Sequence, residues 1–316
     1  KKRPPGNIIL ASAILFLIGF FTASRIRSIW GLYMSYGVLC GLGVGLSYNA
    51  ILSTIPKWYP EKAGFVTGTL LMGMGLGSLL LGAVVKKVMD ILIWPATFKI
   101  LSIVFFSIFL LASFFIVNPK EEVATFENKV NQKDSPLIHT LRTKDFWAVF
   151  IWSVIVSSMG LAVVSNAAYM AIEVGVSLSS LPLMVGMVSI GNGLGRLIFG
   201  TISDRLGGNK AMALGNMVFL IALIFSLLAG KNNISLFIAL GFIFAGMGYG
   251  ASPTLSAALT KKKFGEKYYP QNLSAIVLAL IPASIIGPTI SAGVYQRFGS
   301  YLNVYYILMV FALLAF

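Results

Sequence analysis

A short polar loop at 200–210 carries residues that could form and break contacts between helices. Asp204 could accept hydrogen bonds from the unpaired amides at the N-terminus of a neighbouring helix. Such contacts can open and close as helices move. A solvated turn with ordinary flanking charges is the alternative interpretation. The loop residues that we expect to control such movement are Gly200, Asp204, Arg205, Gly207 and Lys210.

Arg196 is the most informative single residue. It lies eight residues before Asp204, which is about 12 Å along a helix. A guanidinium remains charged and is costly inside a membrane, so it should face a wet cavity or a partner. Asn192 lies one turn away on the same helix face, and no acidic residue lies within reach on this segment. We therefore expect Arg196 to bind a substrate anion, with snorkelling to the membrane surface as the alternative.

Two tyrosines accompany glycine-rich runs. Tyr48 and Asn49 follow the run 41–45, and Tyr249 lies within the run 246–250. Glycines thin a helix so that another helix or a ligand can approach. A tyrosine hydroxyl within the membrane needs a partner, because leaving it unpaired costs about 1–3 kcal/mol. These residues are candidate substrate donors, with interhelical hydrogen bonds as the alternative. Glu173, at the outer end of its helix, is expected to be solvated.

The elements that must position these residues are apolar. Of the 316 residues, 57% are hydrophobic and 11% are charged, against about 25% charged residues in soluble domains. This composition excludes a soluble enzyme, a disordered chain and a nucleic-acid-binding domain. The net charge of +14 then reflects loop residues beside a membrane. One cysteine and one histidine exclude an intramolecular disulfide and a Cys/His zinc site, so we expect no metal and no cofactor.

Segments of roughly 20 apolar residues predict membrane-spanning helices. The sequence contains ten of them, and the last one ends within its apolar run, so we expect it to be cut. The predicted helices are 8–24, 30–54, 64–85, 93–117, 146–172, 180–203, 211–229, 234–258, 271–293 and 301–316.

The basic residues predict the topology. Alternate loops, beginning with the N-terminal tail, carry 16 Lys and Arg, whereas the other set carries 6. The positive-inside rule places the first set in the cytoplasm. The polar segment 118–144 belongs to that set and cannot lie in lipid. We therefore expect an integral protein of the plasma (inner) membrane with a cytoplasmic linker at 118–144.

A repeat of 205 residues relates the two sides of this linker. The glycine run 41–45 matches 246–250, and the Glu-Lys pair at 61–62 matches 266–267. The simplest account is an all-α membrane protein of two six-helix bundles, with the first two helices missing and the last one cut. Parallel six-helix repeats are a known transporter plan. The predicted domains are an N-terminal helix bundle at 1–117, the linker at 118–144 and a C-terminal helix bundle at 145–316.

The pattern G-x-x-x-D-R-x-G-x-x-K at 200–210 resembles the cytoplasmic loop signature of the major facilitator superfamily. A first copy would lie between the second and third helices of such a protein, and 1–3 is similar to its end. Gly208 and Asn209 stand where a second base is more usual. The resemblance covers the whole chain, from the third helix to part of the twelfth. It implies a transporter that rocks between two states, with this loop latching one of them.

A second resemblance narrows the family. The runs GVGLSYN at 43–49 and PKWYPEKAG at 56–64 resemble the oxalate/formate antiporters and their monocarboxylate transporter relatives. Those proteins carry an arginine in the eighth helix, where Arg196 stands, and a tyrosine in the tenth, where Tyr249 stands. The resemblance implies that Arg196 clamps a carboxylate. The other implied substrate residues are Asn192, Tyr249, Tyr48 and Asn49.

One departure from this branch affects the expected substrate. The dicarboxylate-transporting type has a second base in the eleventh helix, whereas 271–293 has none and Leu280 stands at the matching position. A dianion such as oxalate would meet one cation, so we expect a monoanion.

The expected function is secondary active transport of a small monocarboxylate such as lactate, pyruvate or formate, and the chain is expected not to be an enzyme. Transport would run as symport or antiport, with protons or a counter-anion as the second partner. We expect a functional monomer in the lipid bilayer and no nucleic-acid partner. Two alternatives remain open, namely an exporter of drugs or amino acids with the same fold and a non-transporting membrane receptor.

Overall fold

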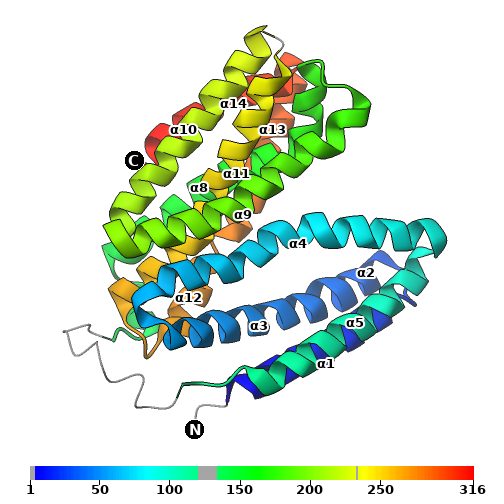
Figure 1. Ribbon diagram of the computed structural model, residues 1–316, viewed down its shortest axis with the longest axis vertical. Coiled ribbons are helices and arrows are strands. Elements are labelled where there is room, and N and C mark those ends of the chain that lie inside the picture. The colour runs from blue at the N-terminus through cyan, green and yellow to red at the C-terminus, as the bar shows by residue number, and fades with distance from the viewer. Residues whose placement is uncertain (1–3, 120–133, 233) are drawn as a thin grey trace. The chain divides into compact units, whose positions relative to one another are not determined.

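The protein is described here by a computed structural model that covers residues 4–119, 134–232 and 234–316 (Figure 1). Every regular element within these ranges is a helix, which confirms the all-helical fold. Eight described helices are long and apolar enough to cross a membrane. The other two predicted spans also lie on helices, 64–85 within α4 (Ala63–Ile91) and 301–316 on the short apolar helix Tyr301–Leu314.

The chain forms two compact units. The first contains Lys1–Pro60 and Leu80–Val130, and the second contains Glu61–Leu79 and Asn131–Phe316. Helix α4 therefore contributes its first half to the second unit. The division into bundles at 1–117 and 145–316 stays a prediction.

The first unit is built on a packed pair of apolar helices. Helix α1 (Pro5–Ala23) packs along α5 (Trp94–Phe115), and Phe16 and Phe20 form a core with Cys40. Three elements continue from α1 along the chain: the single turn α2 (Ile29–Leu32), a π-helical stretch (Tyr33–Cys40) and α3 (Gly41–Thr54).

The second unit surrounds one central helix. Helix α11 (Ser235–Phe264) packs against α8, α9, α10 and α12, and most of its residues are buried or half-buried. The other long helices of the unit are α8 (Lys144–Glu173), α9 (Leu181–Leu206), α10 (Gly208–Asn232), α12 (Tyr269–Val277), α13 (Leu280–Phe298) and α14 (Val304–Leu314). Helix α13 packs against α8, and α14 packs against α8 and α10.

Glycines allow α9 and α11 to touch along their backbones. A Cβ added at Gly191 or Gly195 of α9 would collide with a backbone carbonyl of α11. In the same way, a Cβ at Gly246 or Gly250 of α11 would collide with a carbonyl of α9. This small-residue packing fixes the spacing of the two helices.

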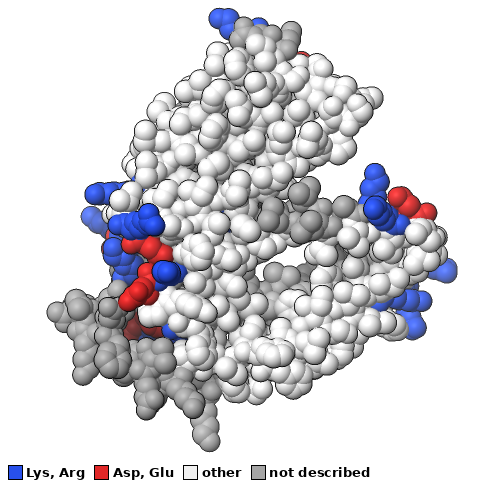
Figure 2. All heavy atoms as spheres, in the orientation of Figure 1, with Lys and Arg blue, Asp and Glu red and all other residues white. Residues whose placement is uncertain are grey.

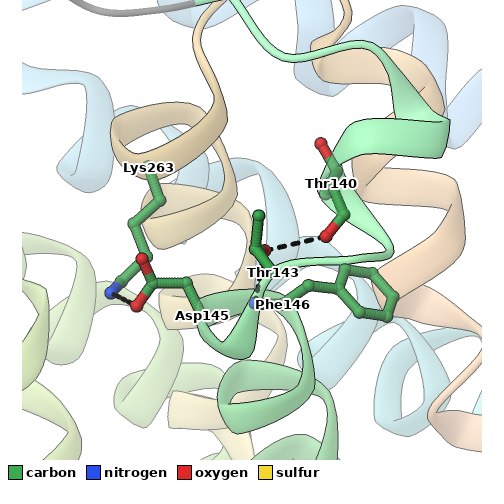
Figure 3. A network of polar contacts seen from close by, with 5 residues as sticks. All are labelled: Thr140, Thr143, Asp145, Phe146 and Lys263. Carbon is green, nitrogen blue, oxygen red and sulfur yellow. Dashed lines mark hydrogen bonds and ion pairs between the residues drawn. The ribbon is translucent and has the colours of Figure 1, made fainter.

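The start of α8 is tied to the end of α11. The Thr143 hydroxyl accepts a hydrogen bond from the Phe146 amide at 3.2 Å and caps the helix. One residue into α8, Asp145 pairs with Lys263 at 2.6 Å (Figure 3). These contacts fix where the chain enters the second unit after the predicted linker, of which 120–133 lies outside the described residues.

Glu173 is not a solvated rim residue, and that expectation is wrong. Its carboxylate accepts hydrogen bonds from the Ser300 hydroxyl at 2.7 Å and from the Tyr301 amide at 2.8 Å. The ring of Tyr301 stacks on Tyr169 of α8. Glu173 thus ties the end of α8 to the chain entering α14. Residue types along the chain do not indicate this contact, because the partners of Glu173 lie 127 to 129 residues away in the sequence.

On one face of the molecule, most charged side chains lie near helix ends. On the face drawn in Figure 2, Lys, Arg, Asp and Glu gather near loops, and the helical stretches between them carry other residues. This distribution suits helices whose middle parts contact lipid.

Candidate functional site

Arg196 is buried in the second unit. Its side chain is 8% exposed. Its Nε donates a hydrogen bond to Oδ1 of Asn192 at 2.8 Å, and one terminal nitrogen donates to the carbonyl of Leu71 on α4 at 2.7 Å. Asn192 lies one turn nearer the start of α9, so the guanidinium points away from the loop at 200–210. This geometry does not match a side chain that snorkels to the loop side of the membrane.

Tyr249 lies beside this pair. Its phenol interacts electrostatically with Arg196, and the next residue, Gly250, contacts the carbonyl of Asn192. Its ring packs on Gly160 of α8, where an added Cβ would collide with it. The fold therefore brings together Arg196, Asn192 and Tyr249 from two helices. Arg196 and Tyr249 are 53 residues apart in the sequence.

Asp204 caps the start of α4. Its two carboxylate oxygens accept hydrogen bonds from the amides of Gly64 and Phe65, each at 2.8 Å. These amides have no partner within their own helix, and the helix dipole favours a negative charge there. Gly200 allows the backbones of α9 and α4 to approach closely, because a Cβ on it would collide with the Gly64 carbonyl.

The rest of the loop turns the chain from α9 into α10. Gly207 has φ +85°, a left-handed conformation that glycine adopts without strain, and it ends α9. Arg205 and Lys210 are exposed on either side of it. The structure thus separates the five predicted loop residues into Gly200 and Asp204, which contact the start of α4, and the turn formed by Arg205, Gly207 and Lys210.

The sequence interpretation missed the half of this site that α4 supplies. Gly68 lies one turn after Gly64, and a Cβ on it would collide with the backbone carbonyl of Arg196. Leu71 lies about 4.5 Å further along α4, where its carbonyl meets the guanidinium. The Gly64/Gly68 spacing is a small-xxx-small pattern that could have indicated this approach.

Tyr48 and Asn49 lie on α3 in the first unit, not in the unit of Arg196. Both are half-buried. The Asn49 amide nitrogen donates to the Gly45 carbonyl at 3.0 Å, whereas its buried Oδ1 has no hydrogen-bond partner among the residues that the structure describes. A buried acceptor of this kind costs free energy unless a donor reaches it. A site that combines these two residues with Arg196 stays a prediction.

Leu280 lies at a break in a membrane-spanning segment. Helix α12 ends at Val277 and α13 begins at Leu280. Pro282 lacks an amide hydrogen, so it suits the first turn of α13. The Leu280 side chain is 41% exposed. In the related dicarboxylate transporters this position is expected to hold a second base. Leu280 is exposed enough to be replaced by a longer side chain.

The sequence of this chain matches a known protein family. The family described as Major Facilitator Superfamily matches residues 3–167 and 151–316. An uncharacterised transporter of that type from Escherichia coli, YhjX, is 28% identical over 285 residues, which is 88% of this chain and 69% of YhjX. The oxalate:formate antiporter of Oxalobacter formigenes is 27% identical over 300 residues, covering 94% and 71% of the two chains.

More distant similarities agree with this family. Human monocarboxylate transporter 10 is 21% identical over 322 residues, covering 95% of this chain and 60% of that protein. Among solved structures, the superfamily transporter FucP in its outward conformation has a TM-score of 0.69 at 15% identity, covering 99% of this chain and 83% of that chain. At that identity the match shows the fold alone.

Proposed function

This chain belongs to the Major Facilitator Superfamily, and on that premise we propose that it transports a small organic monocarboxylate such as lactate, pyruvate or formate. It is an integral membrane carrier and not an enzyme, so the substrate crosses the membrane unchanged. Transport proceeds by alternating access between two helical bundles, 1–117 and 145–316, joined by the linker 118–144.

The observation that carries the proposal is the buried charge at Arg196. The residue is 8% exposed, and the hydrogen bonds of its guanidinium include those to the oxygens of Asn192 and Leu71. A carboxylate suits such a group, because it accepts two parallel hydrogen bonds from the planar fork and carries one negative charge.

The neighbouring groups suit a small anion. Tyr249 supplies a hydroxyl near Arg196, and Tyr48 and Asn49 are proposed to complete the site from α3. The relatives support the same chemistry by name, since they include an oxalate:formate antiporter and monocarboxylate transporters. The carrier acts as a monomer, and its second partner is a proton or a counter-anion.

Counterflow in proteoliposomes tests the proposal. Vesicles loaded with unlabelled lactate, pyruvate or formate should accumulate the labelled form of the same anion, whereas empty vesicles should not. Vesicles without protein are the control. Accumulation driven by neutral amino acids or apolar drugs, with no response to monocarboxylates, would identify an exporter of another class. Binding of a monocarboxylate without any flux would indicate a receptor.

Replacing Asp204 with Asn should slow exchange without weakening substrate binding. The change removes the charge that caps α4 at Gly64 and Phe65, an interaction worth about 0.3–1 kcal/mol at exposed positions. We expect lactate exchange to slow severalfold. Arg205→Gln, in the exposed turn, is the matched control and should have a smaller effect. A large loss of equilibrium affinity with a normal exchange rate would contradict this role for the loop.

A further inference from the structure

Helix α4 touches α9 along three successive turns. At the loop end, Gly64 faces Gly200 and Asp204. One turn further, Gly68 faces the backbone of Arg196, and beyond it the Leu71 carbonyl accepts from the guanidinium. Under the proposed bundle division, α4 and α9 belong to opposite bundles, so this contact must open when the bundles rock apart.

We propose that the Leu71 carbonyl occupies the place of the substrate carboxylate on Arg196, so that substrate binding releases α4 from α9. The inference rests on the proposed function, because it requires Arg196 to be the anion site. An amide carbonyl offers a partial charge to one terminal nitrogen, whereas a carboxylate offers a full charge to two donors. The substrate therefore displaces Leu71 and removes this hydrogen bond between the two helices.

This exchange couples binding to movement. With Leu71 displaced, α4 is held to α9 by glycine packing and by the Asp204 cap at the loop end. By thermodynamic linkage, the reverse also holds: any change that weakens the Leu71–Arg196 bond must raise substrate affinity, because less of the protein is in the competing state.

Gly68→Ala tests this linkage. The new methyl group would collide with the Arg196 carbonyl and hold α4 away from α9 at the level of the bond. We expect the dissociation constant for labelled lactate, measured at equilibrium on purified protein in lipid nanodiscs, to fall about tenfold, the equivalent of one modest hydrogen bond to a charged group. Gly73→Ala is the matched control, because an added Cβ there has nothing within 4 Å, and its affinity should equal that of the wild type.

A backbone variant keeps the test decisive if Gly68→Ala fails to fold. Replacing Met72 with its α-hydroxy acid analogue turns the 71–72 amide into an ester, whose carbonyl is a weaker acceptor. We expect a severalfold gain in lactate affinity, whereas the same exchange at Met74 should have no effect. Spin labels at Glu61 and Leu206, in a Cys40→Ala background, should separate when lactate is added.

The outcomes distinguish this inference from the proposed function. Lactate binding that is unchanged or weaker in both the folded Gly68→Ala protein and the ester variant, but lost in Arg196→Gln, would overturn the exchange and leave the anion site standing. So would spin labels that fail to separate while lactate binds. Wild-type lactate binding by Arg196→Gln would overturn the proposed function itself.

Discussion

Replacing Arg196 with glutamine is expected to abolish monocarboxylate transport while leaving the protein folded and inserted. Glutamine retains an amide that can bond to Asn192 but removes the charge that a carboxylate needs. Truncating one partner of a buried, hydrogen-bonded charge pair costs about 2–5 kcal/mol, which corresponds to a loss of about thirtyfold or more in affinity. Uptake of labelled lactate into proteoliposomes, normalised to inserted protein, measures the effect.

Two further variants help to interpret the result for Arg196→Gln. Arg196→Lys keeps the charge but loses the planar fork, so we expect partial activity between that of the wild type and Arg196→Gln. Lys231→Gln removes an exposed cation at the end of α10 and should leave uptake unchanged. Normal uptake by Arg196→Gln would show that the arginine serves packing and not the substrate.

The second large expected effect is preference for a monoanion over a dianion by more than a hundredfold in affinity. Arg196 can neutralise one carboxylate, and a second one would enter the site without a counter-charge. An unpaired buried ion costs several kcal/mol, and about 1.4 kcal/mol corresponds to a factor of ten. Competition of labelled lactate uptake by unlabelled formate and oxalate measures this preference.

Leu280→Lys provides the converse experiment. The residue is 41% exposed at the start of α13, so a lysine there is not forced into the core. We expect this variant to shift the preference toward oxalate. Ser284→Lys, also exposed on α13, is the matched control for added charge. Oxalate that competes as well as formate in the wild type would show that the charge count is wrong.

Much of the fold follows from the sequence because lipid imposes simple rules. Apolar segments of about 20 residues must be helical where no water can bond their backbone, and all ten predicted segments coincide with helices. The ends of helices were less predictable. The segment predicted as 30–54 runs within a longer span, Ile29–Trp58, that includes a π-helical stretch, because polar or aromatic residues near an interface do not break a helix.

The candidate site could be predicted from the sequence only where side chains, and not the backbone, form it. Arg196, Asn192 and Tyr249 are conspicuous as polar residues in apolar helices, and the structure brings them together. Leu71 is an ordinary leucine whose contribution is its backbone carbonyl, so residue type gives no sign of it. The approach of α4 to α9 depends on glycines at 64 and 68, and glycines are too common in this chain to mark one contact.

The backbone packing of α9 against α11 has a consequence for the direction of transport. Helices that touch through glycines cannot slide past one another, since any shift drives a carbonyl into a neighbouring Cα. Arg196 and Tyr249 should therefore keep their separation throughout the transport cycle. The two side chains then offer the substrate the same arrangement of donors from either side of the membrane. The gradients of the anion and of its second partner across the membrane, and not a change in the spacing of Arg196 and Tyr249, then decide which way net flow runs.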